Sequence, residues 1–437
     1  MNELSRRNLL TAGLAAAAVS LAANETAHAK SKPKPLKPRP DVPADALARD
    51  EAYWRTVAAQ YDVTREVVQL ENGYWGVMAN PVRAAFDSYH QMINQRSSLY
   101  ARREFDNDLE RVRQRVATQL GVSIEEIVLT RGATEALQAL IGGYNRLAPG
   151  DAVLYSDLDY DSMQMAMNWL PARRGVEVVK IALPEPATYQ GLIDTYAAAL
   201  DAHPHVRLIL LTHVSHRTGL LLPIKEIVAM ARARGVDAIV DSAHAWGQID
   251  FKLDDLGADF VGLNLHKWMG APLGVGVLYI RRARIPAIDV FMANDEFPSD
   301  DVRARIHTGT LNFANFLTVS DALDFQELIG IPAKEARLRH LRDLWVVPLR
   351  ARGGLEILTP QDPRLYCAGT SFRLPGRTSV ADNAAIAKDL LDRFGIFTIH
   401  RTGVAAGACV RVTPAVFTSG DDIQRLVHAL QEIAPAA

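Results

Sequence analysis

Between Glu125 and Arg282 the chain alternates short β-branched and aliphatic runs with longer segments whose apolar positions recur every three or four residues. This alternation is typical of an α/β domain. Amphipathic segments such as 134–144, 191–203 and 224–234 predict helices that join parallel strands by right-handed crossovers. The runs that predict strands are 127–130, 152–156, 176–183, 206–214, 238–242, 260–264 and 274–280.

The connection between the last two predicted strands differs from the others. Only residues 265–273 separate them, and this segment is too short for a helical crossover. We therefore expect the strand at 274–280 to pair antiparallel, within a seven-stranded, mostly parallel sheet.

The pattern changes beyond about Asn315, where a long helical stretch runs to Arg352. We expect a smaller α+β domain formed by residues 44–80 and 315–437, beside a large domain of residues 81–314. Its later elements are predicted as a strand at 370–374, a helix at 380–394, an extended segment at 408–413 and a final helix at 420–432.

The first residues have the organisation of an export signal. Arg6 and Arg7 precede an uncharged Ala/Leu stretch at 9–23, and Ala-His-Ala at 27–29 is a cleavage motif. The arginine pair followed by leucines resembles a twin-arginine signal peptide over 1–29, and an ordinary signal with a chance arginine pair is the alternative. We expect cleavage after Ala29, no membrane anchor afterwards, and a periplasmic location.

Residues 30–43 are rich in Pro and Lys and open on a run at 30–35 without apolar residues, which predicts a disordered tether. The chain has two cysteines, Cys367 and Cys409, which are too few for a disulfide framework even if the protein is exported. One bridge between them is an alternative, and two buried thiols are the favoured arrangement.

The composition of the chain limits the classes of binding partner that we expect. With 437 residues, 49% of them hydrophobic, and a formal net charge of -2, the chain is globular and has no basic surplus that would favour nucleic acid. A small-molecule substrate is the better expectation.

Three segments at predicted strand ends carry reactive groups. Lys267 follows the strand at 260–264 among apolar residues, which lowers the pKa of its amine. Asp241 ends another strand, where ligands of parallel sheets collect, and His244 lies three residues later. A glycine turn at 130–136 precedes a helix, whose first amides form an anion site. Taken singly, these residues also fit a surface lysine and two helix caps.

As a set, these segments fit pyridoxal phosphate, which needs an amine, an acid for the pyridine nitrogen, a phosphate cradle and a flat stacking group. Thr-Arg-Gly-Ala-Thr-Glu-Ala at 130–136, Asp-Ser-Ala-His at 241–244 and His-Lys-Trp at 266–268 together resemble the class V aminotransferases, a family of fold type I pyridoxal phosphate enzymes. The resemblance covers about 70–432 and implies a homodimer.

The resemblance implies roles for individual residues. Lys267 would form the Schiff base, Asp241 would pair with the pyridinium, and Tyr160 would stack on the ring. The resemblance also implies cofactor contacts for a further set of residues, of which Thr310 would reach the partner's cofactor: Ala133, Thr134, His216, His244, His266 and Thr310.

Two of these positions carry particular consequences. His216 stands where relatives have an asparagine, so its contact to the cofactor's 3-oxygen depends on its protonation state. Arg411 matches the arginine that binds the substrate's α-carboxylate, and a salt-bridged strand arginine is the alternative.

The reaction is less constrained than the cofactor. Cysteine desulfurases need a cysteine on the loop before the carboxylate arginine, and residues 400–408 contain none. Other local similarities are to isopenicillin N epimerase-like members and to exported enzymes that tailor pyoverdine siderophores in the periplasm. We expect Cα chemistry, such as transamination, on the amino-acid moiety of a peptide metabolite. Epimerisation is the alternative, with Tyr160, Tyr100 or His216 as the second acid, and a non-catalytic amino-acid-binding protein is less favoured.

Overall fold

The structure is a computed structural model that describes residues 36–292 and 294–434. The predicted signal peptide 1–29 and the start of the predicted tether lie outside the described residues. Residues 36–43 carry neither helix nor strand, and helix α2 (Ala44–Ala48) begins directly afterwards.

The predicted seven-stranded sheet is confirmed, with β2-β8-β7-β6-β5-β3-β4 as the order of its strands. Its strand β8 is antiparallel to both neighbours, and the remaining pairs are parallel. The strands end within a few residues of the predicted limits: β2 (Ile127–Thr130), β3 (Ala152–Ser156), β4 (Glu177–Ile181), β5 (Val206–Thr212), β6 (Asp237–Asp241), β7 (Phe260–Asn264) and β8 (Gly276–Ile280).

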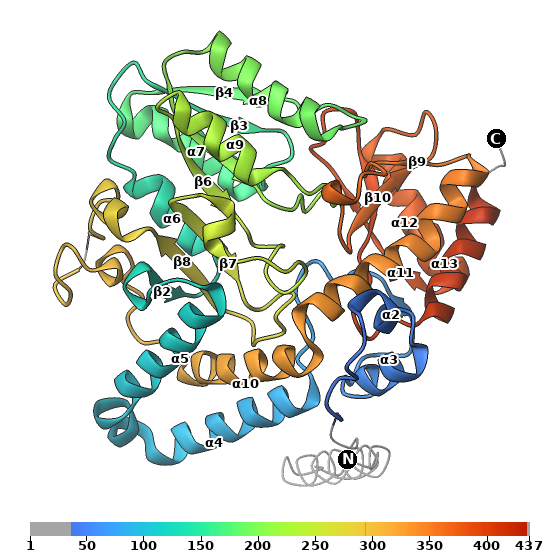
Figure 1. The fold of residues 1–437 in the computed structure, drawn as a ribbon, viewed down its shortest axis with the longest axis horizontal. Coiled ribbons are helices and arrows are strands. Elements are labelled where there is room, and N and C mark those ends of the chain that lie inside the picture. The colour runs from blue at the N-terminus through green and yellow to red at the C-terminus, as the bar shows by residue number, and fades with distance from the viewer. Residues whose placement is uncertain (1–35, 293, 435–437) are drawn as a thin grey trace, which may run out of the picture. The chain divides into compact units, whose positions relative to one another are not determined.

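Crossover helices join the parallel strands and cover the sheet (Figure 1). These are α6 (Ala133–Gly143), α7 (Asp161–Arg174), α8 (Tyr189–Ala202) and α9 (Ile224–Ala233). Helix α6 packs beside α7, and α8 packs beside α9. Apolar side chains of α6 and α7, such as Leu137 and Met163, join those of the strands, such as Leu210 and Ile239, in one buried core. This core fixes the strand ends from which the polar residues project.

A second, four-stranded sheet has the order β12-β13-β10-β9. Three helices pack beside it, seen in orange and red in Figure 1. Its core is separate from that of the large sheet and includes Trp345, Phe372 and Leu426. The strands are β9 (Glu356–Ile357), β10 (Thr370–Arg373), β12 (Ile399–Arg401) and β13 (Cys409–Val412), and the helices are α11 (Ile331–Arg352), α12 (Val380–Phe394) and α13 (Gly420–Ile433).

The N-terminal part of the chain joins this second region. Helix α3 (Glu51–Ala58) is held to α11 by the ion pair of Glu51 with Arg337. Strand β1 (Val68–Gln69) pairs parallel with β11 (Ile396–Phe397). The division into a large domain of residues 81–314 and a smaller one of residues 44–80 and 315–437 stays a prediction.

The single helical stretch predicted over 315–352 is corrected to two helices, α10 (Phe313–Ile329) and α11. Gly330 separates them with a φ of 82°, a conformation that favours glycine. Two more helices, α4 (Asn80–Arg103) and α5 (Phe105–Leu120), lie beside α10 and link the N-terminal segment to the large sheet.

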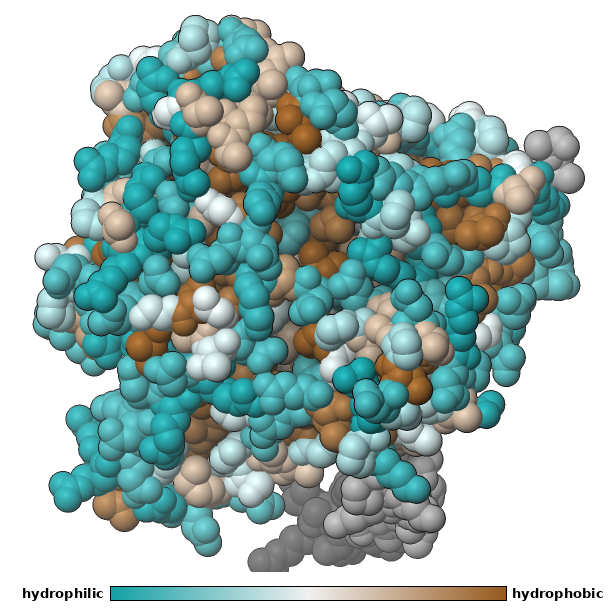
Figure 2. All heavy atoms as spheres, viewed as in Figure 1, coloured by the Kyte–Doolittle hydropathy of each residue, from teal (hydrophilic) through white to brown (hydrophobic). Residues whose placement is uncertain are grey.

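The surface and the two cysteines agree with a globular, disulfide-free chain. On the face shown in Figure 2, hydrophilic side chains predominate and hydrophobic ones form small separate patches. Among the described helices none has the length and apolar character to cross a membrane. Both Cys367 and Cys409 are buried free thiols, which confirms the favoured prediction for them.

Candidate active site

A cavity of about 680 Å³ opens where strands β5, β6 and β7 end, and Thr212, Asp241 and Asn264 line it there. This volume suits a small-molecule site. The cavity brings together most of the predicted site residues: Ala133, Thr134, Tyr160, His216, Asp241, His244, His266 and Lys267.

Hydrogen bonds define the protonation of Lys267. The Nε1–H of Trp268 donates to Nδ1 of His244 over 3.4 Å, and Nε2 of His244 lies 2.9 Å from Nζ of Lys267. An indole N–H can only donate, so Nδ1 accepts and the neutral imidazole carries its hydrogen on Nε2. That hydrogen points to Lys267, whose amine must then accept. The arrangement therefore suits the neutral form of the lysine, which the amine adopts above its pKa.

Burial acts in the same direction. It lowers the pKa of Lys267 from 10.5 to about 8, partly opposed by nearby Asp241 and assisted by Arg411 and Arg401. Burial also lowers the pKa of His244 well below its usual value, so the imidazole stays neutral. A neutral buried amine is the nucleophile that imine formation requires.

The loop that carries Lys267 is held at its carbonyl groups by other elements. The amide of Gly76 donates to the carbonyl of His266 over 2.8 Å, and Nε2 of Gln326 donates to that of Met269 over 3.0 Å. Nζ of Lys334, a buried residue on α11, donates to the carbonyl of Trp268 and to Oε1 of Gln326. A Cβ on Gly76 would lie 1.8 Å from the carbonyl oxygen of Lys267, so only glycine allows this approach.

Asp241 lies at the end of β6, buried to 4% exposure, where Oδ1 accepts the amide of Ala243 over 2.9 Å. Burial raises the pKa of this carboxyl group, and the charge of Lys267 opposes the effect. A cationic ring nitrogen beside it would favour the carboxylate. The position therefore fits the predicted partner of a pyridinium.

The turn before α6 fits the predicted phosphate cradle, with one change. The amide of Ala133 donates to Oδ1 of Asn264 over 2.7 Å, which leaves Thr134 as the donor open to an anion. A Cβ on Gly132 would lie 3.3 Å from Oδ1 of Asn264 and 3.6 Å from Cε1 of His266, so glycine keeps the cradle open. The positive end of α6 faces this space.

His266 also lies at this cradle. Its Nδ1 is 3.2 Å from the carbonyl of Val275. Burial and the nearby Lys267 lower the pKa of the ring to about 4. The carbonyl can only accept, so Nε2 donates to a phosphate only when the ring is doubly protonated. A dianion favours that state, and the contact stays a prediction.

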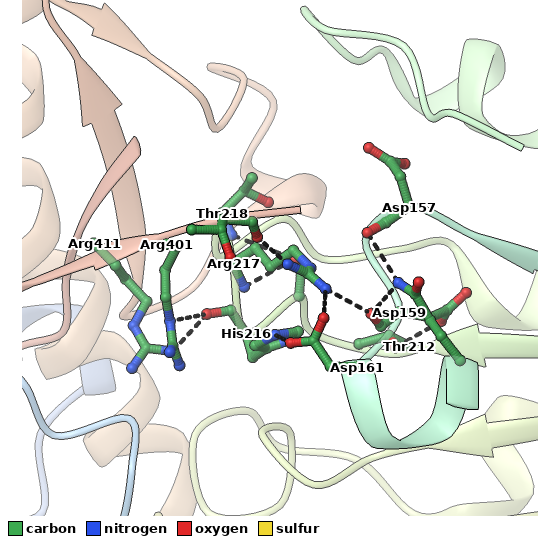
Figure 3. A network of polar contacts seen from close by, with 12 residues as sticks. Asp157, Asp159, Asp161, Thr212, His216, Arg217, Thr218, Arg401 and Arg411 are labelled. Carbon is green, nitrogen blue, oxygen red and sulfur yellow. Dashed lines mark hydrogen bonds and ion pairs between the residues drawn. The ribbon is translucent and has the colours of Figure 1, made fainter. Parts of the chain in front are cut away.

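Three carboxylates fix the loop that presents Tyr160 (Figure 3). Asp159 is buried and accepts from Thr212 Oγ1 over 2.7 Å, although burial raises its pKa to about 7. Asp161 lies 2.5 Å from Nη2 of Arg217, and its contacts with the His216 ring and with the Arg217 guanidinium hold the pKa of this carboxyl group well below its usual range, although burial opposes them. Tyr160 itself is 38% exposed in the cavity wall, where it can stack on a ligand ring.

The remaining carboxylate, Asp157, reaches the loop before Arg411. Its Oδ2 accepts the amide of Ala405 over 2.8 Å, and Arg217 donates to the carbonyl of Thr402. Residues 402–408 are thus tied to the large sheet at two points.

His216 packs edge-on against Tyr160, with ring centroids 5.1 Å apart. Its Nδ1 is buried and has no hydrogen-bond partner in the described residues. Burial lowers the pKa of His216 to about 3 despite Asp161, so the ring is neutral. A neutral imidazole with one unpartnered nitrogen can form the predicted hydrogen bond to the cofactor's 3-oxygen.

Two arginines approach the cavity from the small sheet, and Figure 3 shows them side by side at the main-chain carbonyl of His216. Arg411 is 1% exposed, donates to this carbonyl and pairs with Glu71 over 2.6 Å. Arg401 donates to the same carbonyl through Nε over 3.3 Å and lines the cavity, which Arg411 does not. Arg411 is thus salt-bridged, as the alternative interpretation of the sequence allowed, and carboxylate binding by it stays a prediction.

Two predicted residues lie elsewhere in this chain. Thr310 is exposed and does not line the cavity, although His307 of the same segment does, and its contact with a partner's cofactor stays a prediction. Tyr100 is buried on α4 and donates to Asp108, so it is not a second acid in its own chain's cavity.

The sequence did not point to Asn264, Glu71 or Arg401. Asn264 ends a strand like Asp241 and could have been found by that position. Glu71 and Arg401 gave no comparable local signal, because their partners are distant in the chain.

Comparison with known proteins agrees with this geometry. The family model described as aminotransferase class V matches residues 79–426, which is most of the chain. Isopenicillin N epimerase of Streptomyces clavuligerus is 29% identical over 401 residues, covering 87% of this chain and 98% of the relative.

Solved structures share the fold type I architecture. The apo structure of a cysteine desulfurase from Thermococcus onnurineus NA1 has a TM-score of 0.73 at 21% identity and covers 86% of this chain and 97% of its own. A mutant of C-DES with glycine covalently linked to the pyridoxal phosphate cofactor has a TM-score of 0.72 at 20% identity, covering 85% and 98%. The chain belongs to the class V aminotransferase family of pyridoxal phosphate-dependent enzymes.

Proposed function

We propose that this enzyme acts at the Cα atom of an α-amino acid, carried by a peptide or another small metabolite, and that removal of the α-hydrogen is its first chemical step. The observation that carries the proposal is the buried amine of Lys267, whose pKa is lowered to about 8 and which faces a cavity that also contains Arg401. The amine of Lys267 can move a proton, and the guanidinium of Arg401 can hold a carboxylate.

The residues present divide the work of this step. When bound, pyridoxal phosphate supplies the aldehyde that condenses with the substrate amine and a ring that accepts electrons from Cα. Lys267 takes and returns the α-hydrogen through Nζ. Asp241 keeps a proton on the ring nitrogen, and Thr134 holds the phosphate at the helix N-terminus.

Persulfide formation of the desulfurase type is not favoured. It needs an accessible thiolate, whereas Cys367 and Cys409 are buried and burial raises the pKa of each to about 11. The 402–408 loop carries no cysteine and is tied down by Asp157 and Arg217. Replacement of both cysteines by alanine should leave the Cα activity unchanged.

The experiment follows the α-hydrogen and the amino group separately. Purified enzyme in deuterium oxide is incubated with L-amino acids, D-amino acids and γ-glutamyl peptides, and the products are analysed by mass spectrometry. Deuterium uptake with loss of nitrogen indicates transamination or elimination. If no substrate exchanges its α-hydrogen, the proposal is wrong.

Epimerisation is the second candidate reaction. It rests on the similarity to an epimerase and on a pair of ionisable side chains in the cavity wall. The relative named isopenicillin N epimerase matches over nearly its whole length. Tyr160 and His216 form a second pair of ionisable groups in the cavity wall, which could return a proton to the face opposite Lys267. Deuterium uptake with retained nitrogen and formation of the other enantiomer would identify this reaction.

We further propose export to the periplasm by the twin-arginine route, with a siderophore side group as one substrate candidate. The Arg6–Arg7 pair, the apolar stretch and the Ala-His-Ala motif support it. Arg6→Lys/Arg7→Lys protein should stay in the cytoplasm, and N-terminal sequencing of the exported protein should begin at Lys30. Export of the double-lysine variant at the normal rate would argue for an ordinary secretory signal.

We also propose a homodimer in which Thr310 reaches the partner's cofactor. Its support is that Thr310 is exposed while His307, three residues earlier, lines the cavity. Light scattering should give twice the chain mass, and Thr310→Ala should weaken cofactor retention. A monomer with full cofactor retention would contradict the arrangement.

A further inference from the structure

Lys334 is a buried lysine that does not line the cavity and is not used in the chemistry described above. It belongs to the first turn of α11 and is 4% exposed. Burial lowers the pKa of its amine to about 7, and the two groups that accept hydrogen bonds from it are uncharged. An apolar side chain of similar length would fill the same space without the cost of burying an amine. The reason for a lysine at this position therefore lies in what its amine binds.

The amine of Lys334 binds the loop that follows Lys267. It donates to the carbonyl of Trp268 and, over 2.8 Å, to Oε1 of Gln326. The Nε2 atom of the same glutamine donates to the carbonyl of Met269 over 3.0 Å. A neutral amine and an ammonium group both have two hydrogens for these acceptors, so the contacts do not depend on the charge of Lys334. Two consecutive peptide carbonyl groups after Lys267 are thus fixed from outside the cavity.

The break between α10 and α11 makes these contacts possible. Gln326 lies in the last turn of α10 and Lys334 in the first turn of α11, with Gly330 at the break between them. Both side chains therefore reach the same short loop from consecutive helices. Close packing adds to this support, because a Cβ on Gly247 would lie 2.7 Å from the carbonyl carbon of Trp268. The main chain of Trp268 is held by packing as well as by hydrogen bonds.

The position of the Trp268 peptide decides where its indole lies. The indole Nε1–H reaches Nδ1 of His244 over 3.4 Å, which is long for a hydrogen bond, so a small displacement of the main chain would break it. This bond leaves the hydrogen of His244 on Nε2, 2.9 Å from Nζ of Lys267. If the bond is lost, Nε2 can instead accept from Lys267, which favours the protonated amine. The contact of Lys334 with Trp268 thus affects the basicity of Lys267.

We propose that Lys334 is a positioning residue for Lys267. By holding the peptide of Trp268, it keeps the indole on His244 and the imidazole in the form that presents a hydrogen to the amine. This inference rests on the role of Lys267 in the proposed function. Four charged groups also act on Lys267, and they stay in place in every variant used below: Asp241, Glu71, Arg401 and Arg411.

The test measures the reactivity of Lys267 in the full-length apoenzyme and needs no substrate. Acetic anhydride is added at a series of pH values, and acetylation of each lysine is quantified by peptide mass spectrometry. Only a neutral amine reacts, so the profile of wild-type Lys267 should have its midpoint near pH 8. Lys334→Met keeps the length of the side chain but has no donor. It should lower the reactivity of Lys267 below this midpoint by about three- to tenfold.

A double variant separates the hydrogen-bonded route from a direct effect of the charge of Lys334. Trp268→Phe keeps an aromatic ring but removes the indole donor, and it should lower the reactivity of Lys267 as Lys334→Met does. Adding Lys334→Met to Trp268→Phe should cause no further fall, because both changes break the same chain of contacts. Lys334→Gln keeps a donor and should recover part of the wild-type profile. Lys388→Met, at an exposed lysine on α12, is the control and should leave the profile unchanged.

Three results would overturn the proposal. The first is a Lys334→Met profile equal to that of the wild type, and the second is an unchanged profile in Trp268→Phe. The third is a further fall in the double variant, which would mean that Lys334 acts through its charge. Circular dichroism shows whether each variant is folded, and Lys334→Gln, with a smaller expected fall, replaces an unfolded Lys334→Met. Because no substrate is present, these results are independent of the α-hydrogen exchange that tests the proposed function.

Discussion

Two sides of the cavity are built differently. The cofactor wall, defined as Asp241, His244, Asn264, His266 and Lys267, comes from strand ends of the large sheet and the loops that follow them. The substrate wall, defined as Glu71, Arg401, Arg411 and the main-chain carbonyl of His216, combines a loop of the large sheet with the small sheet and an N-terminal segment.

The walls also differ in how well their polar atoms are satisfied. Buried atoms without a partner in the described residues include Oε2 of Glu71 and Nε of Arg411 in the substrate wall, besides others elsewhere in the molecule. No cofactor-wall residue belongs to that set within the described part of the chain. A buried polar atom without a partner is costly, so the substrate wall is the less well satisfied of the two.

The comparison teaches that the cofactor wall is the more fully hydrogen-bonded of the two. Its lysine, histidine and tryptophan are already connected by hydrogen bonds. Changes in the cofactor wall should therefore affect all substrates alike, whereas changes in the substrate wall should affect some substrates more than others.

The largest effect is expected from Lys267→Ala. Without the amine there is neither covalent attachment of the cofactor nor a base for the α-hydrogen, so the rate should fall at least about 10³-fold. Borohydride reduction followed by mass spectrometry should find no labelled chain. Lys388→Ala, at an exposed lysine on α12, is the control and should be labelled normally. A labelled Lys267→Ala chain would mean that another lysine holds the cofactor.

Asp241→Asn should lower kcat by about 10²- to 10³-fold, because the amide cannot hold a charged ring nitrogen as a carboxylate does. The loss should be similar for every substrate if the comparison of the walls is right. Stopped-flow measurement of α-hydrogen exchange checks it, with Asp254→Asn at an exposed site as the control. A loss confined to one substrate would place Asp241 in the substrate wall.

The pH dependence of the rate of cofactor loading should report the protonation of Lys267. Burial, Arg411 and Arg401 lower the pKa of Lys267 to about 8, while Asp241 raises it. The neutral amine is the nucleophile, so the loading rate should fall about tenfold per pH unit below 8 and level off above it. Mixing apoenzyme with pyridoxal phosphate and following visible absorbance gives the rate. A rate that climbs steadily to pH 10 would indicate a solvated, unperturbed lysine.

The smallest of these effects concerns the support of the lysine loop. Gln326→Ala removes the donor to the carbonyl of Met269 and the acceptor of Lys334, which should reduce the free energy of unfolding by about 1–3 kcal/mol. Urea unfolding measures it. Gln114→Ala, at an exposed position on α5, should change stability very little. Equal stability of both variants would show that the loop does not depend on Gln326.

The cofactor wall could be predicted because its signals are local. Asp241 and Lys267 stand at or just after buried strands, and parallel strands end at one edge of a sheet. The same reasoning predicted the antiparallel strand β8 from the short segment before it.

In the substrate wall His216 and Arg411 were predicted from the family resemblance, but their partners Glu71 and Arg401 were not, because these contacts join remote segments. Glu71 and Arg411 are separated by 340 positions, and Arg401 meets His216 across 185. Helix α4 also escaped prediction, since few of its residues are buried and its apolar pattern is weak. The presence of Gly330 did not predict the break between α10 and α11, because a glycine within a helical pattern ends the helix only where the surrounding packing requires it.

In the ion pair of Glu71 with Arg411, the fold supplies its own anion to one of the two arginines that lie at the carbonyl of His216. A carboxylate that belongs to the chain faces its arginine at an effective concentration in the millimolar range or above, which a dilute metabolite cannot match. The carboxylate of Glu71 thus competes with any substrate carboxylate for Arg411. A neutral residue at position 71 would leave Arg411 as a buried cation without its anion, which a substrate carboxylate would then have to supply.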